Sequence, residues 1–320
     1  MKKHFLPLTF VSLLALTACG TKDYKPQDYV LSLNYKSDFK ILQLTDLHIA
    51  DKDNQDLHYK FMDLTINDAK ADMIVVTGDL FTFTSKSTAI RLFDYLDSKG
   101  LPWTVCFGNH DEQCYFSVDW LTDYLTNYGS HCMFKDIQDD NVNGNCNFVI
   151  NLMEDNKVHD QLFIMDSNRY TFGEYFGYDC FHKDQIKWYE DMIDYTTEQN
   201  GGVVVPSLMF YHIPLPEIND AWEKGTKIYG EKREKTCPPD KDFGFFEVIK
   251  NKGSTKAMFF GHDHVNNFEA DYEGVKFCYG IKSTDRIYHA EDMLGGQVIT
   301  IKDDHSLVID RIYHTYAEVQ

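Results

Sequence analysis

Several features are scarce or missing from this 320-residue chain, and each absence narrows the class of protein. The apolar stretch near the N-terminus covers residues 5–18, which is shorter than the roughly 20 residues that a membrane-spanning helix needs. Lysine and arginine total 31 against 50 aspartates and glutamates, and this net charge of -19 disfavours sequence-independent binding to nucleic acid. The chain also has no Cys-x-x-Cys pair, no internal repeat and no low-complexity tract, so a thiolate zinc site is not expected.

What the chain does contain is enough apolar material for a sizeable core. Hydrophobic residues make up 43% and aromatic residues 15%, which excludes a disordered, collagen-like or polytopic membrane protein. The length allows two small domains or one large α/β domain.

The N-terminal sequence predicts that the protein is located outside the cytoplasm. Lys2 and Lys3 precede the apolar stretch, and the sequence LTACG at residues 16–20 resembles a bacterial lipobox. That resemblance implies cleavage after residue 18 and a lipid on Cys19, which would anchor the protein to a bacterial membrane outside the cytoplasm. An uncleaved anchor or an ordinary signal peptide is the alternative. We interpret residues 1–18 as the signal, 19–37 as a polar tether and 38–320 as the folded domain.

Seven further cysteines follow Cys19, and an odd number leaves at least one thiol free if Cys19 is lipidated. We expect most of them to be small core residues.

Apolar runs and helical patterns alternate in the first 127 residues. Runs at 39–44, 73–76 and 103–107 are typical of buried strands, and the spacing over 59–69 and 89–96 predicts amphipathic helices. Three strand–loop–helix units of this kind indicate an α/β fold with parallel strands and crossover helices.

The second half adds a hairpin and further strands. A turn at 154–157 separates apolar runs at 147–153 and 161–165, and a helix is predicted from residue 183 to about 195. Further strands are expected at 203–211, 256–260, 275–279, 298–301 and 307–312. Residues 214–242 are predicted to form a long polar loop, and loops of this length often contribute to a functional site.

Polar residues follow five of the apolar runs. They are Asp46-x-His48, Gly78-Asp79, Gly108-Asn109-His110-Asp111, His212 and Gly261-His262-Asp263-His264. The carboxyl ends of parallel strands are where α/β sheets assemble sites, and residues i and i+2 of a strand face the same side. Each element alone is commonplace in turns and helix caps, but five in this order are difficult to attribute to chance.

This order of motifs resembles the calcineurin-like metallophosphoesterases. More narrowly, YHIPLP at 211–216, CPP at 237–239 and GHDHVN at 261–266 are similar to the purple-acid-phosphatase-29-like branch. The resemblance covers about residues 38–282. It implies a two-sheet β-sandwich flanked by helices, which is a four-layer α/β/β/α fold, with a dinuclear metal site.

The resemblance also implies a set of seven metal ligands. Asp46, His48 and His264 would hold one ion, Asn109, His212 and His262 would hold the other, and Asp79 would bridge both. Oxygen and nitrogen donors suit Fe, Mn or Zn. A carboxylate suits the bridge because it has two oxygens to share, and bound metal ions would let an acidic protein accept a phosphorylated substrate.

In the family, the histidine at the position of His110 assists the leaving oxygen or stabilises phosphoryl charge. Asp111 would orient the His110 ring, or else cap the following helix. Tyr115, Phe116 and Tyr170 are more typical of core packing than of a pocket wall. The remaining histidines lack a motif and are interpreted as structural or solvated: positions 4, 58, 131, 159, 182, 289, 305 and 314.

Two positions depart from the purple acid phosphatase pattern. Thr82 occupies the position of the tyrosine that colours the iron, and Lys282 stands near the place of an arginine that grips phosphate. An iron–tyrosinate centre is therefore not expected.

The sequence thus predicts a dinuclear phosphoesterase, foremost a phosphomonoesterase that attacks its small phosphorylated substrate with metal-activated hydroxide. A phosphodiesterase is the alternative on the same scaffold, and a metal-bearing binding lipoprotein without turnover is the rival of another class.

Overall fold

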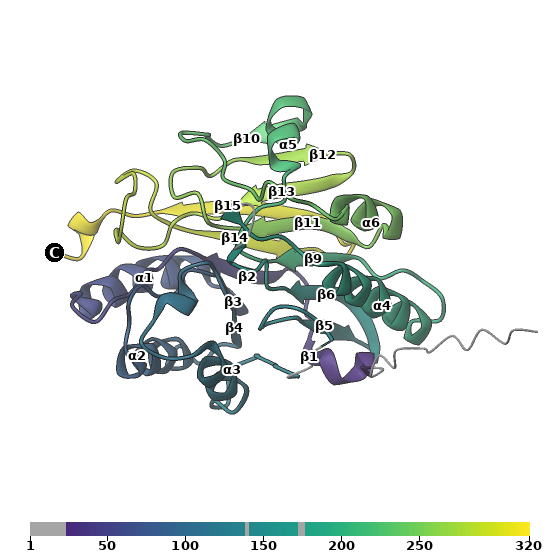
Figure 1. The fold of residues 1–320 in the computed structure, drawn as a ribbon, viewed down its shortest axis with the longest axis horizontal. Coiled ribbons are helices and arrows are strands. Elements are labelled where there is room, and N and C mark those ends of the chain that lie inside the picture. The colour runs from purple at the N-terminus through teal and green to yellow at the C-terminus, as the bar shows by residue number, and fades with distance from the viewer. Residues whose placement is uncertain (1–23, 138–140, 172–176) are drawn as a thin grey trace, which may run out of the picture.

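The computed structural model describes residues 24–137, 141–171 and 177–320. Two β-sheets lie against each other, with α1, α2 and α3 beside one sheet and α4 and α6 beside the other (Figure 1). Cys19 and the predicted signal lie outside the described residues.

The larger sheet has eight strands, and its central four are parallel. In spatial order they are β1 (Val30–Asn34), β5 (Phe148–Glu154), β6 (Lys157–Ile164), β9 (Ser207–Phe210), β11 (Thr255–Phe260), β13 (Val275–Tyr279), β12 (Glu269–Tyr272) and β10 (Thr226–Tyr229).

The second sheet has five strands, three of them parallel. They are β15 (Leu307–Tyr313), β14 (Gly295–Ile301), β2 (Phe39–Leu44), β3 (Met73–Thr77) and β4 (Trp103–Cys106). A short ribbon joins β7 (Tyr170–Thr171) to β8 (Gly177–Tyr178).

The helices follow the strands in the expected crossover pattern. They are α1 (Gln55–Ala69), α2 (Lys86–Asp97), α3 (Val118–Thr126), α4 (Lys183–Gln199), α5 (Ile218–Lys224) and α6 (Phe245–Lys252), with 3-10 turns η1 (Pro26–Tyr29), η2 (Asp111–Gln113) and η3 (Tyr316–Glu318).

Strand alternation divides the apolar residues between two cores. Along β9, Leu208 and Phe210 enter the core between the sheets, whereas Met209 and the adjoining Tyr211 pack in the core beneath α4 and α6. Because successive strand residues point to opposite faces, a run that is buried throughout implies a sheet covered on both sides. The predicted four-layer α/β/β/α fold is confirmed.

Three predicted boundaries are wrong. Residues 30–34 are not tether but form β1, which pairs in parallel with β5. The strand expected from 203 begins only at Ser207, since Val203 and Val204 are exposed. The expected loop 214–242 contains α5 and β10, and all four residues of β10 are exposed, which explains why no hydrophobic pattern revealed this strand.

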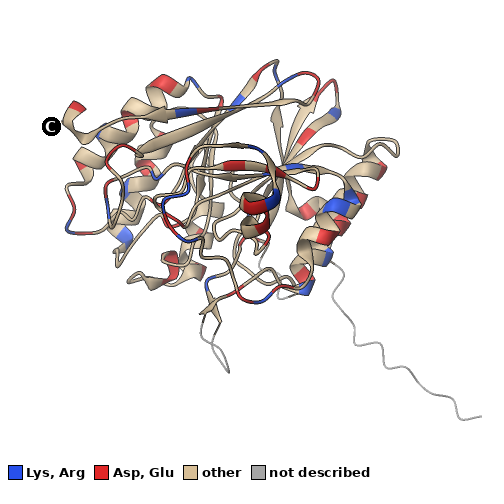
Figure 2. Cartoon of the chain, turned by 90° about the horizontal axis from the view of Figure 1, so that it is seen from above, with Lys and Arg blue, Asp and Glu red and all other residues tan. Residues whose placement is uncertain are grey.

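The parallel strands of both sheets direct their carboxyl ends to the same end of the sandwich, which is where the predicted ligands lie. No helix within the described ranges is long and apolar enough to cross a membrane. Acidic residues are spread over helices and loops, with lysines and arginines among them (Figure 2).

Candidate metal centre

All seven predicted ligands are buried at one end of the sandwich. They lie in the loops that leave five strands: Asp46 and His48 after β2, Asp79 after β3, Asn109 after β4, His212 after β9, and His262 and His264 after β11. The prediction that polar residues gather at the strand ends is therefore correct.

Turned backbone, rather than strand alternation, brings these side chains together. The φ angles of Asp46, His48, Asp79 and His262 are 54°, 49°, 49° and 82°, in the left-handed region that residues other than glycine rarely adopt. Strain of this kind is typical of functional sites that the surrounding structure holds in place. The prediction that these ligands converge because residues i and i+2 of a strand face the same side was therefore wrong in its cause. The ligands do converge, through turns in the backbone.

Two glycines allow the ligand loops to approach each other closely. A Cβ on Gly108 would lie 2.3 Å from Asp79 Oδ1, and a Cβ on Gly261 would lie 2.5 Å from Asp46 Oδ2. No other residue fits at these contacts without moving a ligand.

The first group consists of Asp46, His48, Asp79 and His264, whose ligand atoms lie within 4.8 Å of one another. The Nε2 atoms of His48 and His264 are only 3.0 Å apart. His264 Nδ1 lies 2.9 Å from the carbonyl oxygen of Tyr288 and therefore donates to it, which leaves Nε2 as a lone pair. His48 Nδ1 pairs with the Thr82 hydroxyl at 2.8 Å. Both Nε2 atoms therefore face the space between the two rings, where they are placed to bind an ion.

The second group has ligand atoms without a hydrogen-bond partner. Asn109 Oδ1, His212 Nε2 and His262 Nε2 are buried and unpaired. Asn109 Nδ2 donates to the Tyr170 hydroxyl at 3.1 Å, and His212 Nδ1 donates to the Thr77 carbonyl at 2.9 Å, which leaves Asn109 Oδ1 and His212 Nε2 facing the other ligands. A buried unpaired polar atom costs about 1–3 kcal/mol, which coordination to an ion would offset.

Asp79 lies between the two groups. Its Oδ2 is 3.2 Å from His212 Nε2 and 3.6 Å from His48 Nε2. Its Oδ1 accepts a hydrogen bond from the His110 backbone N–H at 2.8 Å. A single oxygen therefore faces both groups, instead of one oxygen serving each ion.

Burial and neighbouring charges set the protonation of these side chains. Burial alone would raise the pKa of Asp79, but His212 and His48 lower it well below the usual range. Burial, reinforced by His212, lowers the pKa of His262 to about 3. Burial lowers the pKa of His212, but Asp79 and Asp46 raise it to about 10 overall. Anionic carboxylates and a neutral His262 are the ligand forms, whereas a metal ion must displace a proton from His212.

His110 lies beside the ligands without joining them. Its ring is 5.2 Å from that of His48, and its Nδ1 pairs with Gln113 Oε1 at 2.8 Å. The prediction that Asp111 orients this ring is wrong, because Asp111 Oδ1 and Oδ2 instead accept from the backbone N–H groups of Phe81 and Gly108, at 3.1 and 2.7 Å. Asp111 thereby ties together the loops that carry Asp79 and Asn109.

The residues that support the ligands were not predicted in that role. Lys282 is buried and its Nζ donates to the carbonyl of Asp46 at 2.8 Å, so it supports a ligand loop rather than facing the substrate. Burial lowers the pKa of Lys282 to about 8. Thr82, noted only as a departure, positions His48. The ring of Tyr178 meets His262 edge-on at 4.4 Å, and that of Tyr288 stacks on His264 at 4.3 Å.

Part of the expected loop 214–242 is fixed against the loop that carries His262 and His264. Glu234 Oε1 accepts from the Val265 N–H at 2.9 Å, and Asp263 Oδ2 accepts from the Cys237 N–H at 3.2 Å. Segment 231–237 is therefore next to the metal centre. Cys237 and the other six described cysteines are free thiols, and four of the seven are buried.

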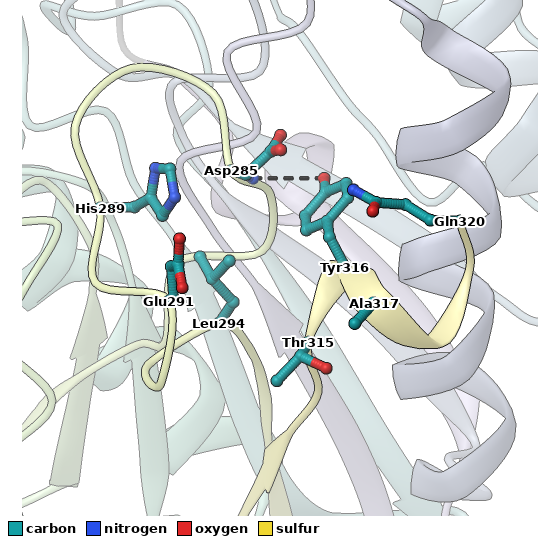
Figure 3. Close-up of a pocket in the computed structure, with 8 residues that line it drawn as sticks. All are labelled: Asp285, His289, Glu291, Leu294, Thr315, Tyr316, Ala317 and Gln320. Atoms are coloured by element: carbon teal, nitrogen blue, oxygen red, sulfur yellow. Dashed lines mark hydrogen bonds between the residues drawn. The ribbon is translucent and has the colours of Figure 1, made fainter.

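A cavity of about 320 Å³ lies elsewhere, beside the C-terminal turn η3 (Figure 3). Asp285, His289 and Glu291 line it, and the Tyr316 hydroxyl accepts from the Asp285 N–H at 3.2 Å. None of the seven ligands lines this cavity. Its two carboxylates would repel a phosphate group, so its chemistry differs from that of the metal centre.

Comparison with known proteins agrees with this geometry. "Probable inactive purple acid phosphatase 14" of Arabidopsis thaliana is 28% identical over 305 residues, which cover 83% of this chain and 75% of that protein. "Probable inactive purple acid phosphatase 29" of the same plant is 28% identical over 285 residues, covering 78% and 73%. A dimetal phosphatase from Danio rerio shares the fold with a TM-score of 0.57 at 14% identity, over 86% of this chain and 96% of that one. Residues 39–266 match the family model of the calcineurin-like phosphoesterases. Since that match spans most of the chain, the protein belongs to the calcineurin-like phosphoesterase family.

Proposed function

We propose that this protein is a metal-dependent phosphatase that hydrolyses small phosphomonoesters. The observation that carries the proposal is the convergence of buried nitrogen and oxygen atoms at one point. The Nε2 atoms of His48 and His264 lie 3.0 Å apart, and Asn109 Oδ1, His212 Nε2 and His262 Nε2 have no hydrogen-bond partner.

The donor set fits two ions chosen from Fe, Mn and Zn, because all its atoms are nitrogen or oxygen. Asp46, His48 and His264 would hold one, Asn109, His212 and His262 the other, with Asp79 Oδ2 between them. When bound, such a pair neutralises phosphoryl charge and lowers the pKa of water towards about 7.

His110 is suited to protonate the leaving oxygen. It is partly exposed, so its ring is open to a substrate at the ligand cluster. Gln113 Oε1 accepts from Nδ1 and fixes the ring, which leaves Nε2 to carry the transferable proton in the imidazolium form. Tyr178 and Tyr288 flank the ligands and would contact the organic part of the ester.

The names of the plant relatives include the word "inactive", which favours a binding protein without turnover as the second candidate. This chain, however, retains all seven ligand residues and His110. A phosphodiesterase would use the same ligands and differs in the substrate it accepts.

We also propose that the enzyme acts outside the cytoplasm, held to a bacterial membrane by a lipid on Cys19. The support is the LTACG sequence at residues 16–20 after a short apolar stretch. A palmitate analogue should label the wild type but not Cys19→Ala, and equal labelling of both would refute the anchor.

The test compares hydrolysis of p-nitrophenyl phosphate with that of its bis-ester, before and after chelation and with Fe, Mn or Zn restored. We expect faster turnover of the monoester, loss with the chelator and recovery with metal. His262→Ala should abolish activity, whereas His289→Ala, in the cavity of Figure 3, should retain it. Faster turnover of the bis-ester would indicate a diesterase, and bound metal without hydrolysis of either would indicate a binding protein.

A further inference from the structure

A second group of metal-binding side chains lies at the other end of the sandwich. His159 and Asp160 are at the start of β6, and His305 is in the turn between β14 and β15. β14 runs antiparallel to β2, with Ile301 opposite Phe39, so this turn lies at the end of β2 remote from Asp46. The group therefore joins the two sheets far from the candidate metal centre.

A β-bulge aims two consecutive side chains at the same point. Leu152 pairs with Asp160 and Met153 with Val158, so His159 is the extra residue in its strand. In a regular strand, neighbouring side chains point to opposite faces, whereas a bulge redirects one of them. His159 Nδ1 and Asp160 Oδ2 are consequently in direct contact.

His305 completes the group from the other sheet. Its Nδ1 lies 3.0 Å from the same Asp160 oxygen, and its ring centre is 4.3 Å from that of His159. The φ angle of His305 is 64°, which turns its side chain back towards the sandwich. Tyr35 stacks on His159 at 3.7 Å between ring centres and fixes that ring from behind.

The charge of this group is not balanced by a permanent cation. The Asp160 side chain is 2% exposed, and its ion-pair partners among the described residues are His159 and His305 alone. These two imidazoles are therefore the groups that face the charge of the buried Asp160 carboxylate. Such a charge is costly unless it is paired or coordinates a metal.

We propose that His159, Asp160 and His305 form a separate binding site for one zinc ion. Two imidazole nitrogens and one carboxylate oxygen are typical zinc ligands, and water commonly takes the fourth position. The three ligand atoms lie within 4.8 Å of one another. Ligands of a tetrahedral zinc ion, at about 2.0–2.1 Å from the metal, are roughly 3.3 Å apart, so the two contacts with Asp160 Oδ2 need to lengthen only slightly.

Zinc at this site would link the two sheets. The Nδ1 atoms of His159 and His305, which now face Asp160, would bind the ion. Each bound ring would then carry its proton on Nε2. The His305 side chain is 39% exposed, which provides a route from solvent. The site is independent of phosphoester hydrolysis, since no member contacts the candidate metal centre.

The test measures the zinc retained by the purified full chain after incubation with Zn²⁺ at pH 7.5 and gel filtration. His305→Asn and Asp160→Asn should each retain about one ion fewer per chain than the wild type. Asparagine tolerates the left-handed backbone at 305, so His305→Asn should fold normally. This variant should also keep wild-type phosphatase activity, which separates the zinc site from the proposed function.

A matched control is available in His182. Its Nε2 lies 3.0 Å from Asp179 Oδ2, and its side chain is 35% exposed, but the described residues offer this pair no third His, Cys, Asp or Glu ligand. His182→Asn should therefore retain as much zinc as the wild type. Equal zinc in the wild type and His305→Asn would overturn the proposal, as would an equal loss from His182→Asn, which would identify unspecific surface binding.

Discussion

The hydrogen bond from His48 to Thr82 provides a sharp test of how the first ion would be held. Thr82→Val keeps the size of the side chain but removes the Oγ1 atom that lies 2.8 Å from His48 Nδ1. Without that partner, the imidazole loses the contact that fixes the orientation of its ring.

The expected magnitude follows from this single contact. Loss of an outer partner of a metal-binding histidine typically weakens metal affinity about 10–100-fold. At about 1.4 kcal/mol for each factor of ten, this corresponds to roughly 1.4–2.8 kcal/mol of binding free energy. The ion held by Asn109, His212 and His262 should be retained. Among the described residues, no hydrogen bond joins Thr82 to any of these three ligands.

Competition with a chelator, followed by elemental analysis, measures this loss. Thr84→Val is a suitable control, because Thr84 Oγ1 donates to the Ile49 carbonyl at 2.5 Å, two residues away from Thr82. It should lower thermal stability without changing metal affinity. The reasoning fails if Thr82→Val binds both ions as tightly as the wild type, or if Thr84→Val weakens binding equally.

Three further changes test other parts of the site. His110→Ala should keep both ions and lose about 10²–10⁴-fold in rate on an alkyl phosphate, but far less on p-nitrophenyl phosphate, whose leaving group needs no proton; equal losses on both in steady-state assays would assign His110 to phosphoryl charge instead. Asp111→Asn should lower the free energy of unfolding by about 1–3 kcal/mol in urea titrations, because an amide accepts only one of the two backbone N–H bonds; unchanged stability would contradict its role as a tie. Replacing residues 231–237 with a shorter linker should alter selectivity among phosphate esters more than metal content, and unchanged selectivity would reduce this segment to a connector.

The clustering of Asp, Asn and His residues was predictable because they follow five apolar runs, and parallel strands end at a common edge. The assignment of seven of these residues as metal ligands came from the resemblance to the calcineurin-like metallophosphoesterases. The geometry was not predictable in the same way. The left-handed backbone at Asp46, His48 and Asp79 depends on contacts between loops that are remote in the sequence.

Supporting residues were harder to recognise for a related reason. Lys282 and the Tyr288 carbonyl act through single long-range hydrogen bonds, which leave no periodic pattern. His159 and His305 were interpreted as structural or solvated because 145 residues separate His305 from Asp160, and the bulge at His159 is a property of strand pairing. β10 escaped prediction because every residue in it is exposed.

Metal content shows whether Asp79 joins two metal sites. The measurement is elemental analysis of His305→Asn, which removes the separate zinc site, with and without the additional change Asp79→Asn. We expect about two ions per chain in the first protein and a loss of both on the Asp79 change, because its Oδ2 faces both ligand groups. Full occupancy in the Asp79→Asn protein would contradict the role of Asp79 in joining the two sites. No bound metal in either protein would contradict metal binding by the seven ligands.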